Sequence, residues 1–353
     1  MAYTTIDKPS DYFNTKLFTG NGSNGHAISG LDFQPDWVWL KNRNTTNTHE
    51  AFDSVRGATK TLYPDRSDAE YVNATGSLTS FNSDGFTVGS GDGANKSGSG
   101  IASWNWKAGT SFTNDASSTG IGTIDSTGSV SQEAGFSIIS YTGNGTANQS
   151  VAHGLGATPK FIIIKPRSAV GYWCVTNPRF VSVSDPNILY LQETAAEADD
   201  TNINGTTAPS STVFGVDDYG AVNTNGQTQI AYCFTPIKGY SAMGTYVGNG
   251  STDGTFVYTG FKPAWVMVKR TDSTNDWKII DNKRSPINPT AGTLKANSSG
   301  AEDTSEIYYD FCANGYKIRL NAGALNASGG TYIYMAFAEN PFVTSTGVPA
   351  TAR

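Results

Sequence analysis

The sequence predicts an all-β protein of three tandem β-sandwich or jelly-roll-like repeats, each about 100 residues long. Three observations lead to this prediction. A motif with a GNG triplet, a proline and an apolar run occurs three times. Short β-branched and aromatic runs alternate with turn residues throughout the chain, as in sandwiches and jelly rolls. The composition is rich in glycine and poor in charge, which argues against a helical bundle.

The repeated motif begins at Gly20, Gly143 and Gly248, the first glycine of each GNG triplet. The proline of the motif follows after 15, 16 and 15 residues, and a lysine follows the proline after six residues in every copy. The apolar runs are WVWLK, KFIIIK and WVMVK. Because they are apolar at consecutive positions and rich in β-branched and aromatic residues, we expect strands buried on both faces. The proline is expected at the start of each strand, and GNG is expected to form a hairpin turn.

Each copy continues with the same succession of features. A tryptophan stands eight residues after the lysine at Trp173 and Trp277, where the first copy has His49, and the spacing predicts a hairpin. An apolar-then-acidic patch follows, which reads TLYPDRSDAE, ILYLQETAAE and TLKANSSGAE. Each copy ends on a strand of small and aromatic residues, which reads IASWNW, IAYCF and YIYMAF.

These features divide the chain into five parts. The first repeat is expected at 15–109, the second at 136–239, and the third, with a short C-terminal tail, at 240–353. Residues 110–135 are rich in Ser, Thr and Gly and are expected to form a flexible linker on which the first repeat pivots, with an added edge strand as the alternative. Residues 1–14 are expected to be an attachment segment, with an ordered tail or first strand as the alternative.

Composition and charge exclude several classes of protein. A net charge of −6 gives nucleic acid and anionic membranes no electrostatic reason to bind. No apolar run approaches the length of a membrane span, so membrane insertion is not expected. The start of the chain lacks the basic and apolar regions of a signal peptide. The three cysteines are scattered and form no CxxC motif, so no disulfide framework is expected.

No catalytic, metal-binding or cofactor-binding residues are predicted. The three histidines, His26, His49 and His153, fall at positions that do not correspond between copies. Nucleotide-binding, zinc-protease and nucleophile-elbow motifs are missing from the sequence. The paired carboxylates fall in the acidic loop that all three copies share, which favours a solvated loop over an active site.

Two polar pairs recur and are interpreted as structural. Asp53 with Arg56, and Asp281 with Arg284, are expected to be salt bridges that hold each repeat or its neighbour in register.

Three tyrosines are expected in loops. Tyr71, Tyr172 and Tyr219 are candidate contacts for a receptor or glycan, because an aromatic face can stack on a sugar ring while the hydroxyl forms hydrogen bonds.

The succession GFSIISYTGNG, HGLGATPKFIIIK and YVGNGSTDGTFVYTGFKPAWVMVKRT, with the ending YMAFAENPFVTSTGVPATAR, resembles the repeat domain of virion structural proteins of marine tailed bacteriophages, of the tail-fibre or tail type. The likeness extends from about residue 12 to residue 353 and is most specific in the second and third copies. The first copy departs from it at His49 and through DGANKSGSG, which is interpreted as an insertion. The resemblance implies no catalytic residues and no cofactor.

The resemblance further implies a virion protein that is assembled in the host cytoplasm and acts outside the cell. A tail fibre or tail-tip component that contributes to host attachment is the leading hypothesis. It would contact other tail or capsid proteins through its N-terminal segment, form a homo-oligomer such as a trimer, and meet host surface polysaccharide. The alternatives are a capsid decoration or head fibre protein and a lectin-like carbohydrate-binding module. A depolymerising tailspike enzyme is least favoured because the carboxylates are scattered.

Overall fold

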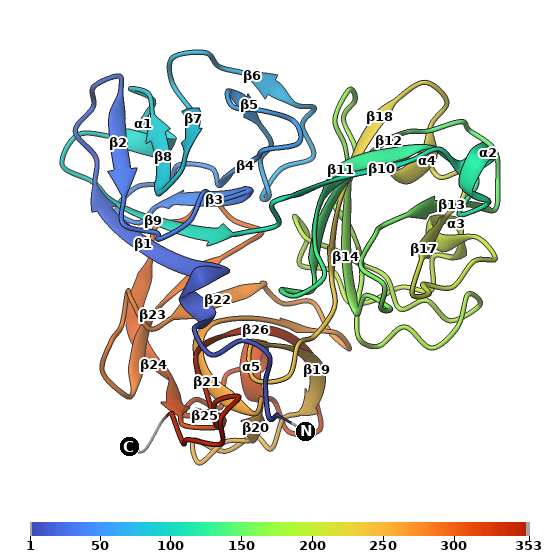
Figure 1. The fold of residues 1–353 in the computed structure, drawn as a ribbon. Coiled ribbons are helices and arrows are strands. Elements are labelled where there is room, and N and C mark those ends of the chain that lie inside the picture. Colours follow the sequence, from blue (N-terminus) through green and yellow to red (C-terminus); the bar gives the residue numbers. More distant parts are fainter. Residues whose placement is uncertain (1, 351–353) are drawn as a thin grey trace.

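A computed structural model describes residues 2–350 as a mainly β protein with several antiparallel sheets (Figure 1). Three large sheets follow one another along the chain. The N-terminal sheet has the strand order β1-β9-β3-β4, and the middle sheet has the order β10-β11-β12-β18-β14-β15-β16. The C-terminal sheet has the order β19-β26-β21-β22-β23-β24-β25-β20 and curls into a nearly closed barrel.

The N-terminal sheet is built from β1 (Phe13–Thr19), β9 (Gly100–Trp106), β3 (Trp37–Asn42) and β4 (Glu50–Asp53). Beside it lie two small sheets, formed by β2 (His26–Ser29), β8 (Gly85–Val88) and β7 (Leu78–Asn82), and by β5 (Lys60–Thr61) and β6 (Tyr71–Val72). The middle sheet contains β10 (Thr110–Asn114), β11 (Ser126–Ser131), β12 (Phe136–Thr142), β18 (Thr228–Phe234), β14 (Phe161–Pro166), β15 (Cys174–Thr176) and β16 (Leu189–Tyr190). A separate pair is formed by β13 (Gln149–Ala152) and β17 (Val213–Val216).

The C-terminal sheet contains β19 (Ser241–Val247), β26 (Thr331–Pro341), β21 (Phe261–Arg270), β22 (Lys278–Asp281), β23 (Thr290–Lys295), β24 (Asp303–Cys312), β25 (Gly315–Ile318) and β20 (Phe256–Tyr258). The helices are single turns: η1 (Pro9–Asp11), α1 (Asp92–Asn95), α2 (Ala116–Thr119), α3 (Thr201–Asn204), α4 (Gly220–Asn223) and α5 (Gly323–Asn326).

The three apolar runs form the buried strands that the sequence predicts. All residues of β3 and β14 are buried, and β21 is buried except at Lys262 and Arg270. In each large sheet this strand pairs with the strand that closes the corresponding part of the chain, as β3 with β9, β14 with β18 and β21 with β26. The proline precedes the first two strands, but Pro263 lies inside β21 at a β-bulge, where a missing N–H is tolerated.

Double burial follows from the alternation of side chains along a strand. In β14, Phe161 and Ile163 enter a core shared by all three sheets, whereas Ile162 and Ile164 enter a core that belongs to the middle sheet. β3 and β21 alternate in the same way between the shared core and a core of their own. Each sheet therefore needs apolar residues on both faces.

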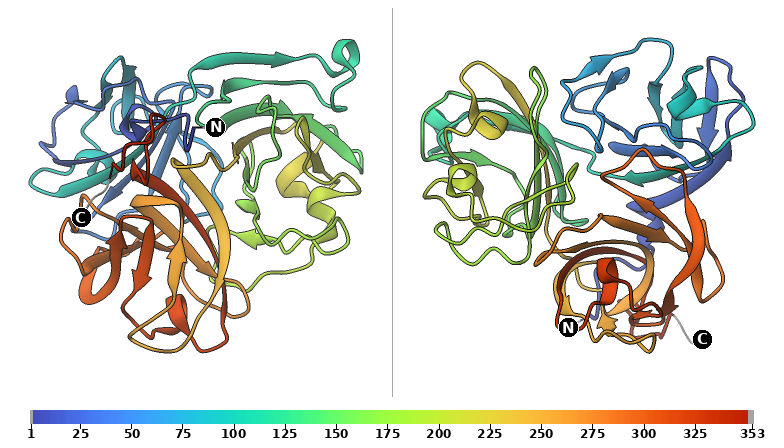
Figure 2. Two further views of the ribbon diagram at one scale, coloured as in Figure 1. Left: turned by 60° about the horizontal axis from the view of Figure 1, so that its bottom comes forward. Right: turned by 180° about the vertical axis from the view of Figure 1, so that it is seen from behind.

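The shared core lies where the three sheets meet (Figure 2). Trp37 of the N-terminal sheet stacks on Tyr232 of the middle sheet with ring centroids 4.5 Å apart. Phe13 stacks on Phe337 of the C-terminal sheet at 4.9 Å. The N-terminal part of the chain is thus packed against both other sheets. The expectation that the first repeat pivots is wrong. A pivoting motion would expose the large aromatic side chains that the three sheets bury against one another, at a high cost in free energy.

Residues 110–135 are not a flexible linker. They contain β10, α2 and β11, and β11 pairs with β12 along six residues, so the segment adds two strands to the edge of the middle sheet. Val130 and Ile124 are buried beneath them. The low apolar content of this segment predicted a linker, but edge strands that are polar on their outer face need few apolar residues to pack against the sheet.

The N-terminal segment packs against the C-terminal part of the chain. Thr4, Ile6 and Pro9 are buried, and the Tyr3 hydroxyl donates to the carbonyl of Gly260 at 2.6 Å. This arrangement matches the alternative of an ordered tail. Among the described helices, none is both long and apolar enough to cross a membrane.

We predict that Ile163→Asp unfolds the protein, because Ile163 is only 1% exposed in the shared core. An unpaired carboxylate there costs several kcal/mol, a large share of a stability of about 5–15 kcal/mol. Urea denaturation followed by fluorescence measures the loss. Val170→Asp, at a side chain that is 72% exposed, is the control and should leave the midpoint unchanged. An unchanged midpoint for Ile163→Asp would show that the shared core is misplaced.

Candidate functional site

The structure places both predicted polar pairs at the ends of strands, in direct contact and fully buried. Arg56 Nε lies 2.5 Å from Asp53 Oδ2, and the Arg56 guanidinium also donates to Glu70 at 3.1 Å and to the carbonyl of Ala51 at 3.0 Å. The turn is fixed by the backbone N–H of Arg56, which donates to Asp53 Oδ1 at 2.8 Å. Burial alone would raise the pKa of Glu70, but its contacts with arginines outweigh burial and lower that pKa.

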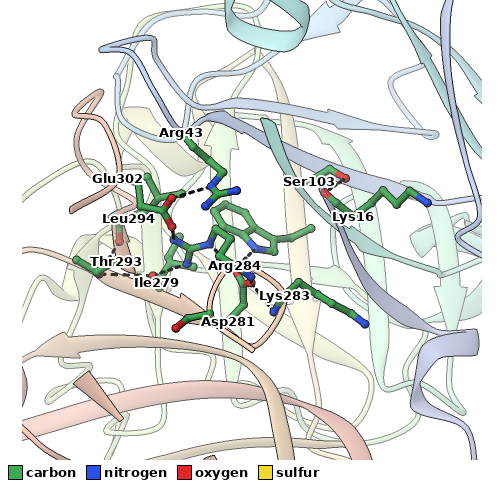
Figure 3. Close-up of polar contacts among 12 residues, drawn as sticks. Lys16, Arg43, Ser103, Ile279, Asp281, Lys283, Arg284, Thr293, Leu294 and Glu302 are labelled. Carbon is green, nitrogen blue, oxygen red and sulfur yellow. Dashed lines mark hydrogen bonds and ion pairs between the residues drawn. The ribbon is translucent and has the colours of Figure 1, made fainter. Parts of the chain in front are cut away.

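The pair at the end of β22 repeats this arrangement. Arg284 Nε lies 2.5 Å from Asp281 Oδ2, and Arg284 Nη1 donates to Glu302 at 2.7 Å (Figure 3). Arg284 Nη2 donates to the carbonyl of Ile279 at 2.9 Å. In both pairs the arginine is bound to two carboxylates and to a backbone carbonyl, so its donors are directed into the protein.

Both pairs are completed by the neighbouring sheet. The Tyr232 hydroxyl of the middle sheet donates to Asp53 at 2.7 Å, and the Trp104 indole N–H of the N-terminal sheet donates to Asp281 at 3.0 Å. The outer carboxylates accept from the neighbour as well: Arg167 reaches Glu70 at 2.9 Å, and Arg43 reaches Glu302 at 2.7 Å. We call these contacts the junction networks, one between the N-terminal and middle sheets and one between the C-terminal and N-terminal sheets.

The contact between the middle and C-terminal sheets lacks the buried aspartate. Asn177 stands at that position, and Arg179 pairs with Glu197 at 2.7 Å. The Glu197 backbone N–H donates to the carbonyl of Thr271 at 2.8 Å, as Glu70 and Glu302 donate to carbonyls of Arg167 and Arg43. Each of the three sheets therefore contacts the other two.

A buried lysine lies at each of the three contacts. Lys41, Lys165 and Lys269 are the second-to-last residues of β3, β14 and β21 and are fully buried. Each ammonium group donates to a carbonyl of the neighbouring part of the chain: Ser299 at 3.0 Å, Ser67 at 3.4 Å and Thr194 at 3.2 Å, respectively. Burial is the main cause that lowers the pKa of each lysine to about 8.

Sequence reasoning missed the role of the short helices. The GNG triplets do not form hairpin turns, because the strands on either side of each triplet pair with other strands and not with each other. Each central asparagine is instead bonded to a buried asparagine at the end of α1, α4 or α5. Asn95, Asn223 and Asn326 donate to Asn21 at 3.0 Å, Asn144 at 3.3 Å and Asn249 at 2.9 Å, respectively. The segment that begins DGAN therefore makes the same contact as AVN and ALN and is not an insertion. The recurring asparagine before each closing strand was the available signal.

The predicted tyrosines divide into two groups. Tyr71 lies in β6 and is 55% exposed. Tyr172 and Tyr219 lie together, and the structure adds Tyr190, which the sequence argument did not select. The Tyr172 and Tyr190 rings are 5.0 Å apart, and Tyr190 donates to Asp200 at 3.0 Å.

Two of the three histidines are buried and make contacts within the fold. His153 is buried, contacts the carbonyl of Ser210 at 3.1 Å, and has its pKa lowered by burial. His49 accepts a hydrogen bond from the Trp39 indole at 2.9 Å. Residues 2–350 contain no group of three or more His, Cys, Asp or Glu that could hold a metal ion.

Comparison with known proteins places the chain in a family. The profile described as "Domain of unknown function (DUF7483)" matches residues 8–341. The chain belongs to this family. The DUF7483 match includes all three large sheets and both junction networks. No curated protein and no solved structure matches the chain.

Asp53→Ala is expected to destabilise the protein by about 3–5 kcal/mol, because it leaves the Arg56 charge buried without its main partner. Tyr232→Phe removes only the bond from the neighbouring sheet and should cost about 1–2 kcal/mol. Urea denaturation tests both variants. Asp68→Ala, which breaks an exposed pair with Arg66, is the control and should cost less than about 1 kcal/mol. Equal small losses for Asp53→Ala and Asp68→Ala would contradict a structural role for the buried pair.

Stability is expected to rise with pH from about 8 to 9. Over this range the unfolded chain holds protons on Lys41, Lys165 and Lys269 that the folded protein has released, because folding lowers these pKa values from 10.5 to about 8. Over the same range the raised pKa values of Glu50, Cys174 and Cys233 act in the opposite direction and make the rise smaller, because the folded protein holds protons that the unfolded chain has lost. Urea midpoints at pH 8 and 9 measure the rise, and Lys165→Met should make it shallower. The same slope in both proteins would contradict the prediction.

Proposed function

We propose that the chain consists of three tandem β-sandwich units closed into a ring, and that it is a non-enzymatic structural protein of a bacteriophage particle. The ring is supported by one kind of backbone contact that recurs between each pair of sheets. At each of the three contacts, the backbone N–H of a loop glutamate donates to a backbone carbonyl near the buried lysine of the neighbouring sheet. The glutamates are Glu70, Glu197 and Glu302, and the carbonyls belong to Arg167, Thr271 and Arg43, respectively. The sequence resemblance supports the assignment to the virion.

A tail fibre or tail-tip component that contributes to host attachment is the function we favour. The charged side chains of the Asp53–Arg56 and Asp281–Arg284 pairs are buried and bound to one another and to the neighbouring sheets, so they have no direct access to a substrate. The N-terminal and C-terminal segments contact each other, since the Ser345 backbone N–H donates to Asp7 at 2.6 Å. This shared face, which includes the N-terminal segment, is our candidate for docking to other virion proteins.

Capsid decoration is the second candidate. Three linked units in one chain offer three similar surfaces, as a symmetric surface lattice would require. In a ring closed within the chain, the junction surfaces are already used, so any homo-oligomer must form through the outer surfaces. Host surface polysaccharide is the ligand we expect for either role, and the protein is expected to function outside the cell after assembly in the host cytoplasm.

Immunogold electron microscopy of purified particles, with antibody against this chain, is the test of location. We expect label on the tail. Label over the head would replace the tail with capsid decoration, and particles without label would contradict the virion assignment. Light scattering of the purified protein adds the oligomeric state: the chain mass is 37.4 kDa, a trimer supports a fibre, and a monomer supports decoration.

A further inference from the structure

We propose that Tyr172, Tyr190 and Tyr219, together with Asp200, form a binding site for a neutral saccharide on the middle sheet. We call these four residues the tyrosine cluster. The inference rests on the proposed attachment function and names the ligand class and the residues that would contact it.

The cluster brings together four segments of the middle part of the chain. Tyr172 lies in the loop before β15, Tyr190 ends β16, Asp200 caps the N-terminus of α3, and Tyr219 immediately precedes α4. The Tyr172 and Tyr190 rings are 5.0 Å apart and inclined by 48°, and Tyr219 packs against the same inner core as Tyr190. Asp200 accepts from Tyr190 at 3.0 Å. Tyr172 is 40% exposed, whereas Tyr190 and Tyr219 are partly buried and pack against the inner core of the middle sheet.

The turns at Tyr172 and Tyr219 do not require an aromatic residue, whereas Tyr190 corresponds to Tyr63 in the first copy. Tyr219 precedes α4 and makes no side-chain capping bond, and the corresponding positions before α1 and α5 are Gly91 and Ala322. Tyr172 precedes Trp173, where Asp276 precedes Trp277 in the C-terminal sheet. The other two parts of the chain build the same turns with smaller or polar side chains. Tyr172, which is 40% exposed, therefore adds aromatic area that its turn does not need. It lies beside Tyr190 and Tyr219, which pack against the inner core of the middle sheet, and this arrangement supports an interaction site.

The chemistry of the cluster fits a sugar. Aromatic faces pack against the C–H face of a pyranose ring, while phenol hydroxyls and a carboxylate exchange hydrogen bonds with its hydroxyl groups. Asp199 and Asp218 flank Asp200 and Tyr219 in the sequence, and the chain carries a net charge of −6. An anionic saccharide would be repelled by these carboxylates, so the ligand is expected to be neutral.

Affinity electrophoresis in gels that contain dextran, mannan or galactan tests the site, with alginate as the anionic probe. We expect retardation by at least one neutral polysaccharide and none by alginate. Tyr172→Thr and Tyr219→Ala, which introduce the residues found at Thr48 and Ala322, should each weaken binding about two- to tenfold, the effect of losing one aromatic contact. Asp200→Asn should also weaken binding. Tyr258→Ala, at a side chain that is 59% exposed elsewhere, is the control and should bind normally.

Several results would overturn the inference. These are no retardation by any of the three neutral polysaccharides, binding to alginate alone, or normal binding by Tyr172→Thr. Because Tyr172 is exposed, this variant is expected to melt as the unaltered protein does, which separates lost binding from lost folding. Particles that carry Tyr172→Thr should still be labelled by the antibody. Failure of the saccharide site is thereby distinguished from failure of the virion assignment.

Discussion

Burial of the Asp53–Arg56 and Asp281–Arg284 pairs is the constraint on which the arrangement of the three sheets depends. A charge removed from water is tolerated only when its hydrogen-bonding capacity is met by partners. Here part of that capacity is met by the adjacent sheet, through Tyr232 in one network and Trp104 in the other. Separation of the sheets would leave buried charges partly unpaired, in addition to exposing the aromatic core. The sheets are thus coupled by polar and apolar contacts at the same place.

The third contact shows that the charge and its partner go together. Met335 in β26 stands at the position that corresponds to Trp104 in the N-terminal sheet. Met335 lies opposite Met267 of β21, just as Trp104 lies opposite Trp39 of β3. Methionine has no N–H or O–H to donate, and the neighbouring part of the chain carries the neutral Asn177 where the other networks have aspartate. A buried carboxylate is therefore present where the adjacent sheet supplies a donor, and missing where it does not.

The sequence predicted the strands better than it predicted their assembly. The nearly equal spacing of the motif and the apolar residues at consecutive positions were enough to find β3, β14 and β21, because burial on both faces leaves a local pattern. The shared core depends on which side of each strand faces the other sheets, and local periodicity does not specify that choice. Residues 110–135 were predicted to be a linker because strands held mainly by backbone hydrogen bonds do not require an apolar composition. The spacing of Asp53 and Arg56 identified a pair, whereas Tyr190 was missed since only the fold brings it to Tyr172.

If the junction networks couple the sheets, the protein should unfold as one cooperative unit even though its three parts have separate inner cores. Native-state hydrogen exchange at increasing urea concentrations measures this most directly. The amides of β3, β14 and β21 should then exchange through one opening, with the same free energy and the same dependence on urea. Exchange of β14 at a clearly lower free energy than β3 and β21 would contradict the coupling and would show three units that are stable independently.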